Sequence, residues 1–202
     1  RRVRAPALAC GMAREGWTRV AVRRTYLELR SLGELRPGRP PSELVELRHR
    51  APIAPVDYLE LYTLVGERWL WRDRLAWTGE ELERYLANPD VHVWSAHARG
   101  HTAGYFELKR HPDSIVEVMY FGLAPAFIGL GIGGWMLTRA AEEAFALDAS
   151  RVILNTCTLD APQALPNYLA RGFTIVREDQ YLLDVPEAGV QRQNELRTTT
   201  RS

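Results

Sequence analysis

The sequence has few cysteines and no long hydrophobic run. Its two cysteines are Cys10, in a basic N-terminal stretch, and Cys157, in an expected strand, so we expect no structural disulfide and interpret Cys157 as a buried strand residue rather than a nucleophile. No segment approaches the roughly 20 apolar residues of a membrane-spanning helix, and the N-terminus lacks the apolar core of a secretory signal. A cytoplasmic protein that binds no membrane is expected.

The chain also lacks an excess of either charge. It has 26 lysines and arginines against 25 aspartates and glutamates, a formal net charge of +1, which gives no electrostatic basis for nucleic-acid binding. Lys109 is the only lysine, a skew best explained by coding bias. The histidines predict no metal site, since His97 and His101 flank an expected turn and are expected to be solvated.

The length and composition predict a single domain. With 202 residues, of which 46% are hydrophobic, the chain can bury one core. We expect an N-terminal tail over residues 1–16, a domain over residues 17–185 and a polar C-terminal tail over residues 186–202.

Two segments before residue 90 have helical patterns. The first is Pro55 to Trp71, with one apolar face at three- and four-residue spacing. The residues expected on that face are Val56, Leu59, Tyr62, Val65 and Trp69. The second begins at a capping-box pattern, Thr78 with Glu81, and ends at Asn88-Pro89.

The remaining segments alternate between strand and helix patterns. Expected strands are residues 18–29, 91–97, 103–110, 114–123, 151–156 and 173–185, the last one a strand or a hairpin; expected helices are 134–147 and 162–170. The helix over 134–147 should bury Met136, Leu137, Ala140, Ala144 and Leu147. This order predicts an α/β fold with a mixed, mainly antiparallel sheet flanked by helices.

A glycine-rich run lies between the expected strand over residues 114–123 and the expected helix over residues 134–147. Glycines in a turn that opens a helix let backbone N–H groups approach an anion, and the helix N-terminus adds about half a unit of positive charge. The run formally contains the dinucleotide pattern G-x-G-x-x-G, but it starts too far from the preceding strand and too few strand–helix units follow. A P-loop is not expected either, because no Gly-Lys-Ser/Thr is present. The residues concerned are Gly129, Leu130, Gly131, Ile132, Gly133 and Gly134.

Two motifs together resemble the GNAT (general N-acetyltransferase) superfamily over about Thr18 to Val185. The glycine run, from Ile128 to Gly133, is similar to the family's acetyl-CoA loop, Arg/Gln-x-x-Gly-x-Gly/Ala, at both glycine positions but not at the first position. Downstream, the segment from Tyr168 to Phe173 is similar to the family's Tyr-x-x-x-Gly-Phe signature. Their order and separation are more specific than either motif alone.

The resemblance implies where acetyl-CoA, the co-substrate, would bind. In this family the strand before the loop pairs its backbone with the pantetheine arm, which here implies Phe121, Gly122 and Leu123, and the pyrophosphate rests on amides of the loop and helix start, here Ile128 to Gly134. Two departures are present: Ile128 stands where the family often has Arg or Gln, and Ala161 stands where many members have an asparagine.

The resemblance also implies two catalytic residues. Glu117, eleven residues before Ile128, has the spacing of the catalytic glutamate of histone-type members and would accept the amine's proton; its alternative is a solvated residue on the outer face of the strand. Tyr168 occupies the position of the family's general acid near the thioester sulfur, and its ring would also pack the helix against the sheet.

The implied function is acetyl-CoA-dependent N-acetylation of a primary amine on a small molecule or peptide by direct attack. Two alternatives stay open: a catalytically silent CoA-binding or regulatory domain, and a transferase for another acyl group. The acceptor wall would include the first helices, where Trp69, Trp71 and Trp77 cluster. Glu67, Asp73 and Glu107 could attract a cationic amine or be merely solvated surface charges. A homodimer is left open.

Overall fold

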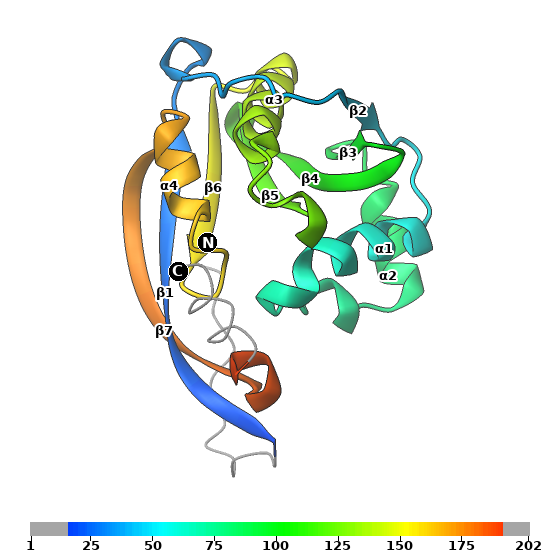
Figure 1. Ribbon diagram of the computed structural model, residues 1–202, viewed down its shortest axis with the longest axis vertical. Coiled ribbons are helices and arrows are strands. Elements are labelled where there is room, and N and C mark those ends of the chain that lie inside the picture. Colours follow the sequence, from blue (N-terminus) through cyan, green and yellow to red (C-terminus); the bar gives the residue numbers. More distant parts are fainter. Residues whose placement is uncertain (1–15, 192–202) are drawn as a thin grey trace.

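The computed structural model describes residues 16–191, which form one seven-stranded sheet with helices on both faces (Figure 1). The expected tails therefore lie largely outside the described residues, although residues 187–191 are helical. The strands are β1 (Trp17–Leu29), β2 (Val45–His49), β3 (Val91–Ala98), β4 (His101–His111), β5 (Ile115–Leu123), β6 (Arg151–Cys157) and β7 (Thr174–Pro186). The α-helices are α1 (Pro55–Gly66), α2 (Gly79–Leu86), α3 (Ile132–Ala146) and α4 (Ala164–Ala170).

The sheet is mixed and mainly antiparallel, as expected. Its strand order is β2-β3-β4-β5-β6-β1-β7, and within residues 16–191 only β5 and β6 pair in parallel. The first strand of the chain thus lies between β6 and β7, far from β2. Two antiparallel halves, β2 to β5 and β6-β1-β7, meet at the parallel seam between β5 and β6.

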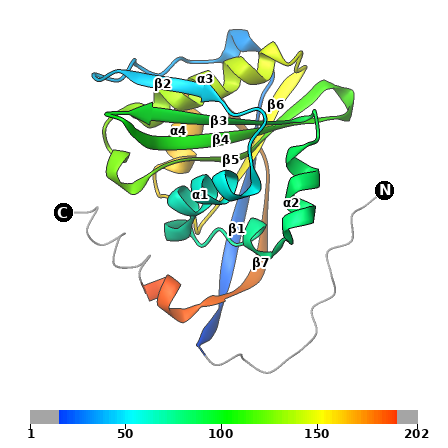
Figure 2. The ribbon, with the colours of Figure 1, turned by 90° about the vertical axis from the view of Figure 1, so that its right-hand side faces the viewer.

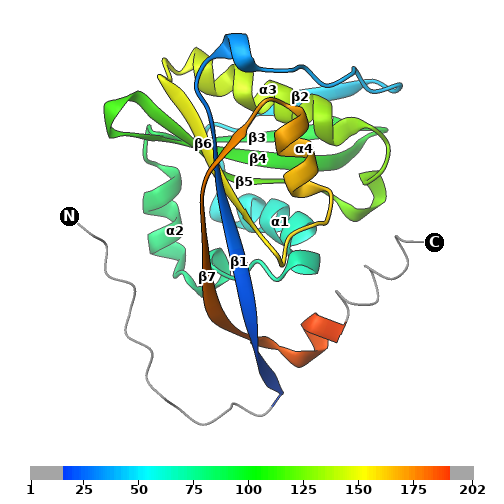
Figure 3. The same ribbon diagram turned by 90° about the vertical axis from the view of Figure 1, so that its left-hand side faces the viewer.

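This seam is short. Four residue pairs join the two strands, ending at Val118 opposite Leu154, although β5 continues to Leu123 and β6 to Cys157. On the other side of β5, pairing with β4 continues to Leu123, with one extra residue at Met119. Beyond the seam the two strands run apart (Figure 3), so one side of the β5 backbone has no strand partner among the described residues.

Helices α1 and α2 cover the face of β3 and β4 seen in Figure 2. The expected buried face of α1 is confirmed only in part: Tyr62 and Val65 are buried and Leu59 packs against the same cluster. Val56, however, is 62% exposed, and Tyr58 and Leu61 are buried instead. The helix also ends at Gly66 instead of Trp71. A Cβ at Gly66 would lie 2.4 Å from the Trp71 ring, which folds back onto this position, and Leu70 adopts a left-handed conformation.

Helices α3 and α4 pack on the opposite face. The α3 residues Met136, Leu137, Ala140 and Ala144 are fully buried as expected, whereas Leu147 is only partly buried. The helix begins at Ile132, two residues earlier than expected, because Gly131 caps it in a left-handed conformation. The last strand is continuous, not a hairpin.

Strand β2 was not expected from the sequence. Its five residues pair with β3, and a strand this short offers little periodicity to detect. None of the helices within residues 16–191 is long and apolar enough to cross a bilayer.

Candidate active site

A cleft of about 600 Å³ lies where β5 and β6 run apart. It is lined by the end of β5, the glycine turn before α3, the end of β6, helix α4, parts of β1 and β7, and residues 69–73 after α1. The predicted residues that line it are Glu117, Phe121, Gly122, Leu123, Ile128, Gly129, Gly131, Gly133, Gly134 and Tyr168. The fold therefore brings ten of the twelve predicted site residues to one cavity.

Two predicted residues do not line this cleft. The Ile132 side chain is fully buried in the core beneath α3, and the Leu130 side chain is 38% exposed. Only their backbone amides are left to contribute to the predicted loop.

The glycine turn exposes the N-terminus of α3. Gly129 and Gly131 have φ angles of +87° and +78°, which favour glycine over residues with a Cβ. The helix start carries no side-chain cap and no acidic residue in its first turn. Its first N–H groups therefore keep their partial positive charge and lack intrahelical partners.

Tyr168 is almost fully buried on α4. Its ring packs edge-on against Phe121 of β5 and against Phe173. Burial, aided by the Asp160 carboxylate, raises the pKa of the Tyr168 hydroxyl above its ordinary value, so the group stays protonated. The signature's glycine, Gly172, has a φ of +96°, and a Cβ there would clash with the Glu34 carbonyl.

Glu117 lies on β5 at the edge of the cleft. Its Oε2 is 2.8 Å from Nε2 of His111, and its side chain is 20% exposed. Glu117 is thus a partly buried carboxylate facing the cavity with a histidine partner, an arrangement suited to proton transfer. Its role stays a prediction.

An aromatic wall lines the side of the cleft next to α1. Trp69 and Trp71 line the cavity, whereas Trp77 packs on Arg74 instead. The Trp71 ring lies 5.1 Å from the ring of Tyr120. Asp73 also faces the cavity, with its Oδ2 3.5 Å from the Tyr120 hydroxyl.

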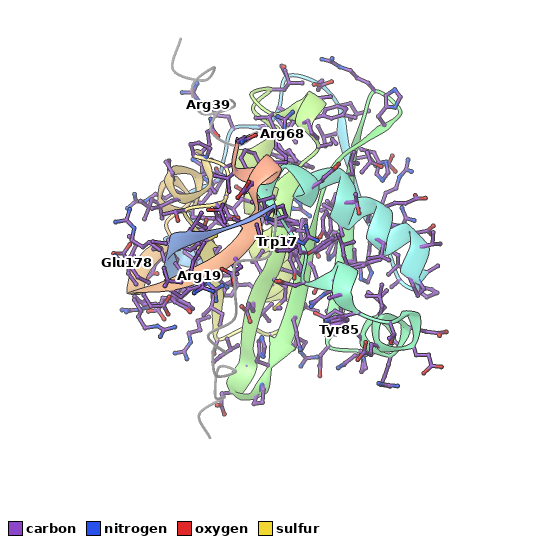
Figure 4. The ribbon with its side chains drawn as sticks, turned by 90° about the horizontal axis from the view of Figure 1, so that it is seen from below. Trp17, Arg19, Arg39, Arg68, Tyr85 and Glu178 are labelled. Atoms are coloured by element: carbon purple, nitrogen blue, oxygen red, sulfur yellow. The ribbon has the colours of Figure 1, made fainter. Side chains whose placement is uncertain are left out.

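Glu107 is not a solvated surface charge. It is fully buried under α1 and α2, where Oε1 is 3.2 Å from Nη2 of Arg74. The hydroxyls of Tyr58 and Tyr85 donate to the same carboxylate; Tyr85 extends from α2 (Figure 4). This network holds the segment after α1 against the sheet.

The opposite wall comes from β6, β1 and β7 and was not anticipated. Arg24, Asn155 and Tyr181 line it. Cys157 belongs to it too, and is half-buried in the cleft instead of buried in the core. Burial and the nearby Asp160 raise the pKa of its thiol, which gives no support for a thiolate nucleophile.

A known protein family matches the part of the chain that contains most of this site. The family model described as the acetyltransferase (GNAT) family matches residues 58–173, more than half of the 202 residues. No curated protein has a significant match to the chain.

Solved structures share the fold at low sequence identity. A GCN5-related N-acetyltransferase from Kribbella flavida is 18% identical with a TM-score of 0.58, over 85% of this chain and 60% of that one. One from Sphaerobacter thermophilus is 13% identical with a TM-score of 0.58, over 85% of this chain and 53% of that one. The chain thus spans less than two thirds of either relative.

A third structure is shorter. The aminoglycoside acetyltransferase meta-AAC0020 from an uncultured soil metagenomic sample is 14% identical with a TM-score of 0.53, over 63% of this chain and 86% of that one. With the matched family model and the shared sheet, the chain belongs to the GNAT family of acetyltransferases.

Proposed function

We propose that the chain is an acetyl-CoA-dependent N-acetyltransferase that transfers an acetyl group to a primary amine of a small molecule or peptide. The observation that carries this proposal is the shared cavity. The unpaired end of β5, the glycine turn of α3, Tyr168 and Glu117 all line one cleft at the β5–β6 seam. Family membership supports the acetyl transfer, and the cleft supports the individual roles.

The residues present fit acetyl-CoA as the co-substrate. From Met119 to Leu123, β5 has backbone groups without a strand partner on the β6 side, which can pair with an extended amide-containing arm as an added strand would. At the turn, a Cβ on Gly129 or Gly131 would meet no atom within 4 Å, so the space around these amides is open to a pyrophosphate. Ile128 adds no charge, and the backbone therefore provides most of the phosphate contacts.

The chemistry requires two proton transfers. The amine nitrogen forms a bond to the thioester carbonyl carbon, the carbon–sulfur bond breaks, and the sulfur leaves with the electron pair. Glu117 accepts the proton that the amine loses, directly or through a water molecule. Tyr168, which burial keeps protonated, donates a proton to the departing sulfur.

The acceptor would lie between the aromatic wall and the β6-β1-β7 wall. Trp69, Trp71 and Tyr120 offer aromatic faces, and Asp73 offers a carboxylate for a protonated amine. An amine with an apolar or aromatic part suits this wall.

Thiol release from acetyl-CoA across a library of primary amines tests the proposal. We expect amine-dependent release that falls at least about tenfold in Glu117→Gln. Glu46→Gln, which removes a solvent-exposed carboxylate paired with Arg48, is the matched control and should leave the rate unchanged.

The two alternatives give different results in the same assay. Binding of acetyl-CoA without acetylation of any amine favours a binding or regulatory domain. A higher kcat/KM with propionyl-CoA or succinyl-CoA than with acetyl-CoA favours another acyl group. If no CoA ester binds, the assignment of the glycine turn is wrong.

A further inference from the structure

The β6-β1-β7 wall presents a separate set of side chains to the acceptor side of the cleft. Arg24 on β1 is directly opposite Cys157 on β6, so both side chains point to the same face. The alternate residues Thr25 and Leu27 are buried toward the other face, where α3 and α4 pack. Arg24 therefore points into the cleft from the side opposite the aromatic wall.

Arg24 lacks a carboxylate partner among residues 16–191. Its Nη2 donates to the Tyr181 hydroxyl at 2.8 Å, and the Tyr26 hydroxyl also interacts with the guanidinium, but its Nε is buried without a hydrogen-bond partner. The nearest acid in register, Asp179, instead accepts from the Tyr26 hydroxyl at 3.0 Å and lies 3.4 Å from Arg177. A buried guanidinium N–H without an acceptor is destabilising unless a ligand provides one.

Tyr181 adds a second donor at the same place. Its hydroxyl oxygen accepts from Arg24, so its own hydrogen is available to an acceptor in the cleft. Burial raises the pKa of Tyr181 and outweighs the opposing effect of Arg24, which keeps the hydroxyl protonated. Two adjacent donors, one of them cationic, match the two oxygens of a carboxylate.

We propose that Arg24 and Tyr181 bind the carboxylate of an acceptor that carries both a primary amine and a carboxylate. The opposite side of the cleft has Glu117 and Asp73, so the two ends of such a molecule face charges of opposite sign. This inference rests on the proposed N-acetyltransferase function and names its substrate class as amino-acid-like amines.

Matched acceptor pairs test this assignment. Each pair is an amino acid and its carboxamide, such as phenylalanine and phenylalaninamide, together with aliphatic and ω-amino acids. For the wild type we expect at least about a tenfold higher kcat/KM for the carboxylate member of the preferred pair, since a site built for a polar group rejects analogues that lack it.

Variants of Arg24 and Tyr181 test whether these residues cause the preference for the carboxylate acceptor. Arg24→Met should raise the KM for the carboxylate acceptor about 10- to 100-fold and change the KM for its carboxamide far less, so that the preference for the carboxylate is lost. Arg24→Lys and Tyr181→Phe should each lose part of the preference. Arg23→Met is the matched control, because the exposed Arg23 side chain does not line the cleft.

The outcomes separate this inference from the proposed function. Equal acetylation of amino acids and carboxamides by the wild type, or a preference that Arg24→Met retains, overturns the inference while N-acetyltransferase activity stands. If no amine is acetylated, the proposed function fails, and calorimetric titration of amino acids into the CoA-saturated protein decides the role of Arg24. Weaker amino-acid binding in Arg24→Met supports the inference, and binding that is absent or equal in both proteins overturns it.

Discussion

Replacing Glu107 by glutamine should lower the free energy of unfolding by about 3–5 kcal/mol, because the substitution leaves a buried guanidinium without its counter-charge. The Glu107 side chain is 0% exposed and that of Arg74 is 6% exposed, and their nearest atoms are 3.2 Å apart. The hydroxyls of Tyr58 and Tyr85 donate to the same carboxylate. Glutamine keeps the size of the side chain but presents an N–H₂ group where one of these donors binds.

Urea unfolding followed by circular dichroism measures this loss. With a slope of about 2 kcal/mol per molar urea, the midpoint should fall by about 2 M. Glu46→Gln is the control, since Glu46 and Arg48 are more than half exposed and such a pair contributes less than about 1 kcal/mol.

A double variant isolates the charge pair. Glu107→Gln combined with Arg74→Met removes both buried charges, so it should be more stable than the sum of the two single losses predicts. A loss in Glu107→Gln no larger than that in Glu46→Gln would refute the reasoning, because the buried network would then contribute nothing measurable.

Three further predictions concern the cleft. Tyr168→Phe should lower the rate of acetyl transfer at least about tenfold with acetyl-CoA affinity nearly unchanged, since only a proton donor is lost; unaltered turnover removes Tyr168 from the mechanism. Gly131→Ala should weaken acetyl-CoA binding about tenfold in calorimetry, because a left-handed conformation costs alanine about 1–2 kcal/mol and the free turn then relaxes to a conformation that does not bind. Gly100→Ala, with a similar φ of +77° in the β3–β4 hairpin, should leave binding unchanged. In a Cys10→Ser background, the raised pKa of Cys157 predicts slow iodoacetamide alkylation at pH 7–8 that accelerates above about pH 9; fast alkylation at pH 7 would contradict it.

Local patterns in the sequence predicted local structure well. The capping box at Thr78 and Glu81 is confirmed, with both reciprocal hydrogen bonds present. The buried face of α3 is also largely as expected. The capping box joins residues three positions apart, and the apolar residues of α3 recur every three to four positions, so both features can be recognised in a short stretch of sequence.

The failures concern residues whose environment is set by distant parts of the chain. The sequence pattern placed Val56 instead of Tyr58 on the buried face of α1. Tyr58 is buried there because its hydroxyl donates to the buried Glu107, 49 residues away. Glu107 itself resembles any charged residue in a strand. Its burial depends on Arg74, which only the packing of α1 and α2 brings within reach.

The sequence by itself determined the glycine turn and the Tyr168-to-Phe173 signature, and through them the family, because positive φ angles and short motifs depend on the identity of neighbouring residues. Only the tertiary structure decided that β1 lies between β6 and β7. That placement brings Arg24 and Tyr181, 157 residues apart, to one wall of the cleft. Strand pairing over such separations is decided by the burial of whole faces of the sheet, and no local pattern records it.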